Sequence, residues 1–177
     1  MARMDKLFWS YFLLYLDFTL NFGIIKINLI PDWLGYLLLL SSLKALQGES
    51  PLFQKPQIWC RILAVYSGLL WFGDLVGVSF NPGGWLLGLA ATFLQLYITL
   101  RVIDGIADVE QFRACSLGSE SLRKAWRVAA AGSVAAFVLV WIPPLAGICA
   151  LISGLSTLII LGRLHITRKL WRMDIGI

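Results

Sequence analysis

Residues 24–40 read IIKINLIPDWLGYLLLL, an apolar stretch that is interrupted by Lys26, Asn28, Pro31 and Asp32 and then continues. Proline lacks an amide hydrogen and suits the first turn of a helix, so Pro31 predicts the start of a returning helix. Charged side chains avoid lipid and favour a membrane boundary or a polar site. The stretch therefore predicts the outward-facing turn of a helical membrane hairpin that lies beside a polar site.

The composition of the whole chain is typical of a polytopic membrane protein. Of the 177 residues, 59% are hydrophobic and 14% are charged, whereas soluble domains carry about 45–50% apolar and about 25% charged residues. A chain of this length has too few charged side chains to cover so much apolar surface in water. The composition therefore predicts an all-α membrane bundle and argues against a large soluble core.

The charge and the cysteine content argue against nucleic-acid binding and against a metal site. The net charge is +5, but the basic residues flank apolar blocks, where orientation signals lie. Cys60, Cys115 and Cys149 are widely spaced and form no CxxC motif, so neither a disulfide framework nor a zinc site is predicted. His165 lies just past the last apolar block and is interpreted as an interfacial side chain. No cofactor is predicted.

Six apolar blocks predict six transmembrane helices in a single domain, residues 1–177. The turns IPDW (30–33), NPGGW (81–85) and WIPPL (141–145) join them into three helical hairpins. The first block contains Asp17 and is followed by no small-x-small cleavage site, so it is interpreted as an uncleaved first helix. The blocks are 7–25, 32–46, 59–80, 85–103, 126–142 and 145–163, with a cytoplasmic connection over 104–125.

Basic and aromatic residues predict the same orientation in the membrane. With six helices, all of the 15 Lys and Arg except Lys26 lie on one side, which the positive-inside rule assigns to the cytoplasm. We therefore expect a multi-pass protein of the cell's inner (plasma) membrane, with both termini cytoplasmic. The tryptophans lie near both boundaries: Trp9, Trp59, Trp126 and Trp171 inside, Trp33, Trp85 and Trp141 outside, and Trp71 somewhat deeper.

Polar side chains at membrane depth predict a small pocket that is open, or nearly open, to the outside. Asp17 and Asp74 each precede an outer turn by about eight residues, or about 12 Å of helix, so we expect them at similar depth. A charge there costs at least about 2.5–3.5 kcal/mol and usually faces protein or a wet cavity. The predicted lining is Asp17, Asn21, Asp74, Thr92 and Gln95, with Lys26, Asn28 and Asp32 at the mouth.

Two hypotheses from different functional classes follow from this pattern. In the first, the pocket binds or transports a small solute or cation, because two close carboxylates favour a cation or share a proton. In the second, the polar residues are interhelical contacts worth about 0.6 kcal/mol per pair, and the chain is a non-transporting scaffold or partner-binding subunit. Such a protein partner would bind the 104–125 segment, where Ile106, Val109 and Phe112 could lie on the membrane surface or contact the partner.

Small residues four positions apart permit close helix packing. Gly132 and Ala136 are one such pair, and Ala131 and Ala135 are another. Packing within one chain is the favoured interpretation of these pairs, and dimerisation is the alternative.

No enzyme activity is predicted. The fragment DGIADVEQF (104–112) resembles the acidic start of the membrane CDP-alcohol phosphotransferase motif, but Ala107 and Asp108 break its frame and the later aspartates are missing. Ser67 and Ser153 have no histidine at matching depth to activate them, so a serine hydrolase is unsupported.

The stretch KINLIPDWLGYLLLL resembles the INxxPDxxGYxLL pattern of an uncharacterised family of small bacterial membrane proteins. The resemblance covers a short part of the chain around Asn28, Pro31, Asp32, Gly35 and Tyr36. It implies no activity and no functional residue. In size, helix number and orientation the chain is also similar to the S-components of energy-coupling-factor transporters, small six-helix proteins with an outward pocket. That likeness is one of build, and fold does not imply function.

Overall fold

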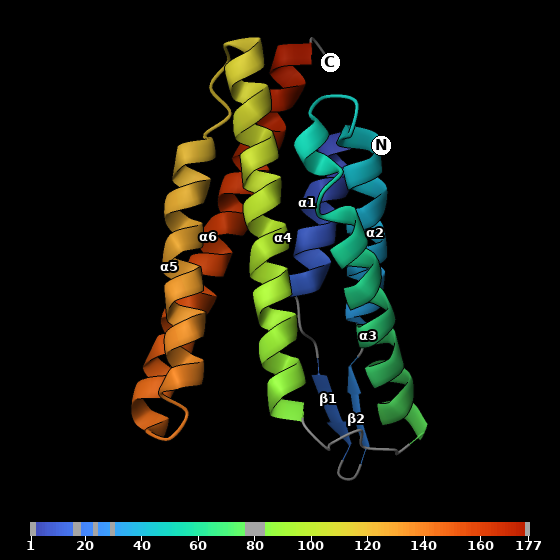
Figure 1. The fold of residues 1–177 in the computed structure, drawn as a ribbon, viewed down its shortest axis with the longest axis vertical. Helices are drawn as coiled ribbons and strands as arrows, with labels where there is room; N and C mark the ends of the chain where they lie inside the picture. The colour runs from blue at the N-terminus through green and yellow to red at the C-terminus, as the bar shows by residue number, and fades with distance from the viewer. Residues whose placement is uncertain (1–2, 16–18, 23–24, 29–30, 77–83, 176–177) are drawn as a thin grey trace. The chain divides into compact units, whose positions relative to one another are not determined.

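The computed structural model describes residues 3–15, 19–22, 25–28, 31–76 and 84–175; at Arg3, in both strands, and at 74–75, 84–85 and 174–175 it describes the backbone alone. This part of the chain forms six α-helices and one two-stranded β-hairpin (Figure 1). The predicted helical fold is confirmed, and the hairpin is an addition to it. The chain divides into two compact units, Met1–Leu94 and Gln95–Ile177.

The first unit is built on three helices, α1 (Arg3–Tyr15), α2 (Asp32–Leu46) and α3 (Gln57–Val76). Helix α2 packs against both α1 and α3, and the 3-10 turn η1 (Pro51–Phe53) precedes α3. The buried residues of α1 recur every three or four positions, so one face of this helix enters the core. They are Met4, Leu7, Tyr11 and Leu14.

Gly35 allows α1 and α2 to approach closely. A Cβ atom at this position would lie 2.7 Å from Cγ of Leu14 and 3.3 Å from its backbone nitrogen. The next residue, Tyr36, is buried, and Leu39 and Leu43 continue the buried face of α2. Packing therefore accounts for the Gly-Tyr pair of the PDWLGY segment.

The first apolar block does not form one long helix. Helix α1 ends at Tyr15, and β1 (Thr19–Phe22) pairs with β2 (Ile25–Asn28) as an antiparallel hairpin. The sequence TLNFGIIKIN is rich in β-branched residues, and only two residues, the first of them glycine, separate the paired segments. Both features favour a hairpin. The helix predicted over 7–25 is therefore wrong for Thr19–Phe22 and for Ile25.

The second unit contains most of the charged residues, the larger part of α4 (Gly84–Arg113) and the longest helix, α6 (Pro143–Ile175). It comprises α4 from Gln95 onward, α5 (Ser119–Val138) and α6. Helices α5 and α6 form an antiparallel pair, joined by a tight turn in which the Ile142 amide donates to the Leu139 carbonyl at 2.8 Å (Figure 1). Pro143 begins α6, as expected for a proline in the first turn of a helix.

Small residues hold α5 and α6 close together. A Cβ atom on Gly132 would lie 3.0 Å from the Cys149 carbonyl oxygen and 3.1 Å from the Ser153 nitrogen. The Ser133 and Ser153 hydroxyls lie 2.7 Å apart, and Ser153 Oγ donates to the Ala129 carbonyl at 3.1 Å. Ser133 is therefore the donor to Ser153. Gly132 serves packing within one chain, the interpretation favoured from the sequence.

Two helical segments, Leu86–Arg113 and Pro143–Met173, are long and apolar enough to cross a membrane, judged by length and composition. Helices α1 and α2 have 13 and 15 residues, which is about 20 and 22 Å of helix. Both are shorter than the hydrocarbon layer of about 30 Å. Within the described residues, length and composition therefore support membrane crossing for two of the six predicted helices.

Candidate functional site

The structure describes the predicted polar pocket in part. Asp17 lies outside the described residues, and Asp74 is described by its backbone alone, near the end of α3. The predicted pairing of these two acids around one cavity therefore stays a prediction. Asn21 does not belong to the helix predicted over 7–25, because it lies in strand β1.

The register of the β-hairpin places three of the predicted site residues, Asn21, Lys26 and Asn28, at neighbouring positions. Thr19 pairs with Asn28, and Asn21 pairs with Lys26. Because alternate residues of a strand belong to opposite faces, these four positions share one face of the hairpin. The other face belongs to two apolar pairs, Leu20 with Ile27 and Phe22 with Ile25. The hairpin is therefore amphipathic, and its polar face carries Asn21, Lys26 and Asn28.

This hairpin lies in the first unit beside α3, and it directly precedes α2 in the chain. Strand β2 lies beside α3, the helix of Asp74. Asp32 is the first residue of α2, and Pro31 before it has the extended backbone (φ −69°, ψ 129°) of a residue that precedes a helix. The predicted start of the returning helix at this proline is confirmed.

Thr92 and Gln95 lie three positions apart on one side of α4. Both are half-buried. The Thr92 hydroxyl donates to the Gly88 carbonyl at 2.9 Å, and the Gln95 carbonyl accepts from the Thr99 hydroxyl at 2.9 Å. The Thr92 hydroxyl proton is thus used within the helix, so Thr92 could offer a ligand only oxygen lone pairs.

A second polar site, which the sequence analysis missed, lies in the second unit where α4 passes α5. Asp104 accepts from Nη2 of Arg123 at 2.6 Å, and its other carboxylate oxygen is 3.6 Å from Nη1 of Arg101. Trp126 donates from Nε1 to the Leu96 carbonyl at 3.0 Å. The Arg101, Asp104 and Arg123 side chains are here called the inner basic cluster. The sequence signal was available, since Arg101 and Asp104 are spaced i, i+3 on a helix.

Glu110 of α4 caps the start of α5. The N-cap residue of α5 is Gly118, which has a left-handed backbone (φ 80°) and no side chain with which to cap the helix. The Glu110 carboxylate accepts from the Ser119 amide at 3.0 Å instead. The Thr167 hydroxyl of α6 donates to the Leu117 carbonyl at 2.8 Å, so the 114–118 connection is held from both sides.

These contacts determine the pKa of the Glu110 carboxyl. Glu110 lies in the charged C-terminal part of α4, beyond the apolar part of this helix. Burial raises the pKa of the Glu110 carboxyl, but hydrogen bonds from Ser119, Leu117 and Gly118 outweigh it and lower the pKa below the usual range. Glu110 is therefore charged at neutral pH, as a helix N-terminus favours.

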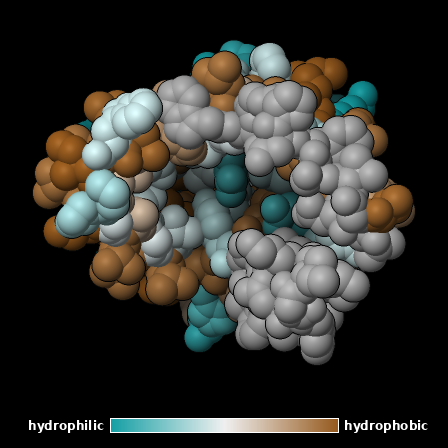
Figure 2. Space-filling view, turned by 90° about the horizontal axis from the view of Figure 1, so that it is seen from below, coloured by the Kyte–Doolittle hydropathy of each residue, from teal (hydrophilic) through white to brown (hydrophobic). Residues whose placement is uncertain are grey.

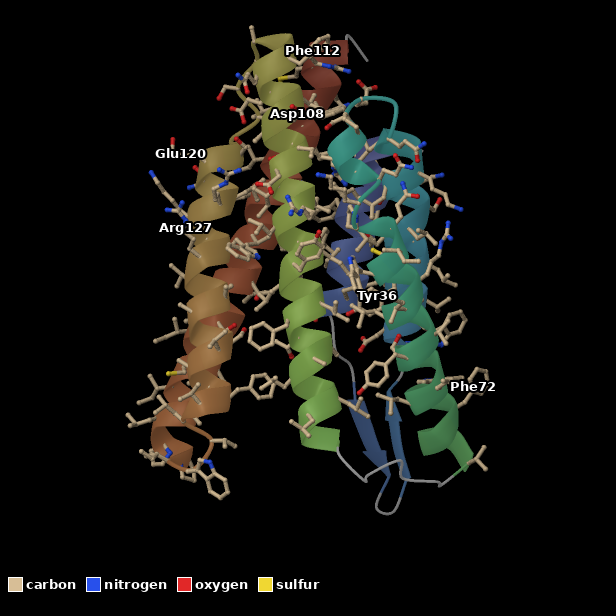
Figure 3. The ribbon with its side chains drawn as sticks, viewed as in Figure 1. Tyr36, Phe72, Asp108, Phe112, Glu120 and Arg127 are labelled. Atoms are coloured by element: carbon tan, nitrogen blue, oxygen red, sulfur yellow. The ribbon has the colours of Figure 1, made fainter. Side chains whose placement is uncertain are left out.

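The 104–125 segment is more ordered than the predicted connection. Helix α4 continues to Arg113 and α5 begins at Ser119, so only 114–118 lies between them. Ile106 and Val109 are buried and do not lie on the membrane surface, which corrects the prediction for both residues; their spacing of three already fits the core face of a helix. Phe112 is 88% exposed, near the end of α4 (Figure 3).

Two of the tryptophans expected at the boundaries, Trp171 and Trp33, make ring contacts within the protein. The guanidinium of Arg113 lies 5.0 Å from the centre of the Trp171 ring, and the Trp171 side chain is buried. In the first unit, Trp33 lies against Trp71 with ring centres 6.5 Å apart. No group of three or more His, Cys, Asp or Glu within the described ranges could hold a metal ion.

Comparison with protein-family models, curated proteins and solved structures finds no match for this chain. The resemblance of the 26–40 stretch to the INxxPDxxGYxLL family, and the likeness in build to the S-components, therefore stay predictions.

Proposed function

We propose that the chain is an integral membrane protein that binds or transports a small polar solute or cation at a site built around its β-hairpin. In this proposal six helices form three hairpins in a bacterial inner membrane, with both termini in the cytoplasm.

Membrane insertion is supported by the exposure of the two long apolar helices. Only 22% of the apolar window of Leu86–Arg113 and 11% of that of Pro143–Met173 is buried. The core helix of a soluble protein would be mostly buried, and soluble monomers rarely expose large contiguous apolar surfaces. Lipid is the solvent that suits these faces.

The band of exposed apolar residues on α6 has the height of a bilayer. It runs from Leu145 to Gly162 and ends at the exposed Arg163, about 27 Å of helix against about 30 Å of hydrocarbon. Trp141, which is 89% exposed, lies at the other end, in the α5–α6 turn. Figure 2 shows brown apolar residues around this end of the pair, at the left.

The β-hairpin is the observation that carries the proposed site. Figure 1 shows it continuing beyond the ends of α1 and α2, and a strand of four residues adds about 13 Å to the about 20 Å of α1. Non-helical backbone at membrane depth is tolerated only where protein covers it or where it lines a wet cavity. Many transporters place non-helical backbone at their solute sites, where discontinuous helices are unwound. The polar face of Asn21, Lys26 and Asn28 suits such a cavity.

Tryptophan fluorescence offers a direct test, because Trp33 follows Asp32 and contacts Trp71. The protein in nanodiscs would be titrated with the chlorides of sodium, potassium, magnesium, calcium and choline. We expect at least one saturable fluorescence change that Trp33→Phe removes. Asn21→Ala with Asn28→Ala should abolish the change, whereas the control Leu20→Val with Ile27→Val, on the apolar face, should keep it.

Two outcomes would count against the proposed site. One is the absence of any saturable response across this panel of salts. The other is a response that survives both Asn21→Ala with Asn28→Ala and Asp17→Asn with Asp74→Asn in normally inserted protein. The second outcome would favour the alternative function, a partner-binding subunit, for which the exposed Phe112 is the supporting observation.

A further inference from the structure

Basic side chains gather where the exposed surface of α5 changes from charged to apolar. Lys124 and Arg127 are exposed on the first turns of this helix, where Figure 3 labels Arg127 and Glu120. The exposed positions that follow are apolar and include Val128, Val134 and Val138. In a membrane-inserted α5, this change marks the boundary between headgroups and hydrocarbon.

The inner basic cluster at this boundary has more positive than negative charge. The guanidinium groups of Arg101 and Arg123 share the single carboxylate of Asp104. Nε of Arg101 is buried and has no hydrogen-bond partner among the described residues. Arg127 follows Arg123 by one turn on the same side of α5, whereas Lys124 is paired with Glu120 at 2.8 Å.

We propose that Arg101, Arg123 and Arg127 bind the phosphate of an anionic phospholipid from the cytoplasmic leaflet. The planar guanidinium fork matches phosphate oxygens in pairs. The exposed valines of α5 next to the cluster would accept the acyl chains, which favours a lipid over free phosphate. This inference concerns the second unit and is independent of the solute site.

Native mass spectrometry of the detergent-purified full chain tests this proposal. The protein would be mixed with equal amounts of phosphatidylglycerol and phosphatidylcholine, and the retained lipid of each kind would be counted. Arg127 is exposed, so Arg127→Gln should fold normally and lower the preference for phosphatidylglycerol about fivefold. Arg101→Gln with Arg127→Gln should lower it further. The matched control is Arg61→Gln, which removes an exposed arginine from α3.

Added inorganic phosphate separates the two possible sources of the phosphate group. Retention of phosphatidylglycerol in excess phosphate supports a lipid site, since the acyl chains contribute to binding. Complete displacement by phosphate would overturn it in favour of a free-anion site. Equal retention of both lipids by the wild-type protein, or an equal loss of preference in Arg61→Gln, would also overturn the proposal.

Discussion

The Glu110 side chain of α4 caps the N-terminus of a different helix, α5. Glycine at the N-cap of α5 leaves the first amides of that helix without a side-chain acceptor. The acid that replaces it comes from the end of the preceding helix, nine residues earlier. Sequence rules for caps examine the N-cap position and the first helical turn, so they cannot find this contact.

Glu110→Gln should lower the stability of the second unit at neutral pH by about 1 kcal/mol, the usual worth of a helix cap. Because the pKa of Glu110 is lowered in the folded protein, its contribution is full above the pKa of an unfolded glutamate. The contribution is lost as the pH falls through the lowered folded value. The difference in melting temperature between wild type and Glu110→Gln should therefore be largest near neutral pH. It should fall to nearly zero in acid.

Glu120→Gln is the matched control for this prediction. A hydrogen bond from Lys124 and its charge lower the pKa of Glu120, but this side chain is 82% exposed and water screens the pair. Its substitution should leave the melting temperature nearly unchanged. A pH-independent difference for Glu110→Gln would show that the charge of Glu110 does not act through the cap.

Residue types at the proposed site could be predicted from the sequence, but their arrangement could not. The polar residues Asn21, Lys26 and Asn28 stand out in an apolar stretch because burying them in lipid is costly. Their alternation with Leu20, Phe22, Ile25 and Ile27 is the period of a strand. An apolar run of this length also fits a helix, and only the observed pairing of Asn21 with Lys26 decides between them.

At the scale of elements, helix starts were easier to predict than helix ends. Pro143 is the first residue of α6, where proline suits the first turn, and Pro31 immediately precedes α2 in an extended conformation. Helix α4 extends ten residues past the predicted end at Ile103, to Arg113. Hydropathy locates only the apolar part of such a helix, whereas the continuation is amphipathic, with Ile106 and Val109 buried and Asp108 exposed.

The α5–α6 pair gives a test of packing at the element scale. Alanine normally stabilises a helix interior by up to about 1 kcal/mol relative to glycine. At Gly132 this gain should be reversed, because the added Cβ would lie only 3.0 Å from a backbone oxygen of α6. Gly132→Ala should therefore lower the free energy of unfolding by about 1–3 kcal/mol. Gly154→Ala on α6 meets no atom within 4 Å and should be neutral or stabilising. Thermal unfolding in detergent measures both; equal shifts of the same sign would contradict the proposed packing.

For the whole molecule, composition predicts the environment better than it predicts the number of membrane crossings. An apolar content of 59% agrees with exposed apolar faces on α4 and α6. The predicted crossings at α1 and α2 would need the β-hairpin as well, because neither helix alone reaches about 30 Å. A hydropathy window counts apolar residues, so it cannot distinguish one long helix from a short helix that is followed by a β-hairpin.

The orientation of the second unit can be tested with single cysteines at its two ends. Trp141→Cys and Glu120→Cys replace exposed side chains at opposite ends of α5, in a background where Cys115 and Cys149 are serine and Cys60 remains buried. We expect a membrane-impermeant maleimide added to intact cells to label position 141 and to reach position 120 only after permeabilisation. The reason is that the positive-inside rule assigns the end of the pair that carries Arg127 and Arg163 to the cytoplasm. The reverse pattern would invert the proposed topology and move the inner basic cluster to the outer leaflet. Labelling of both positions in intact cells would show that α5 does not cross the membrane.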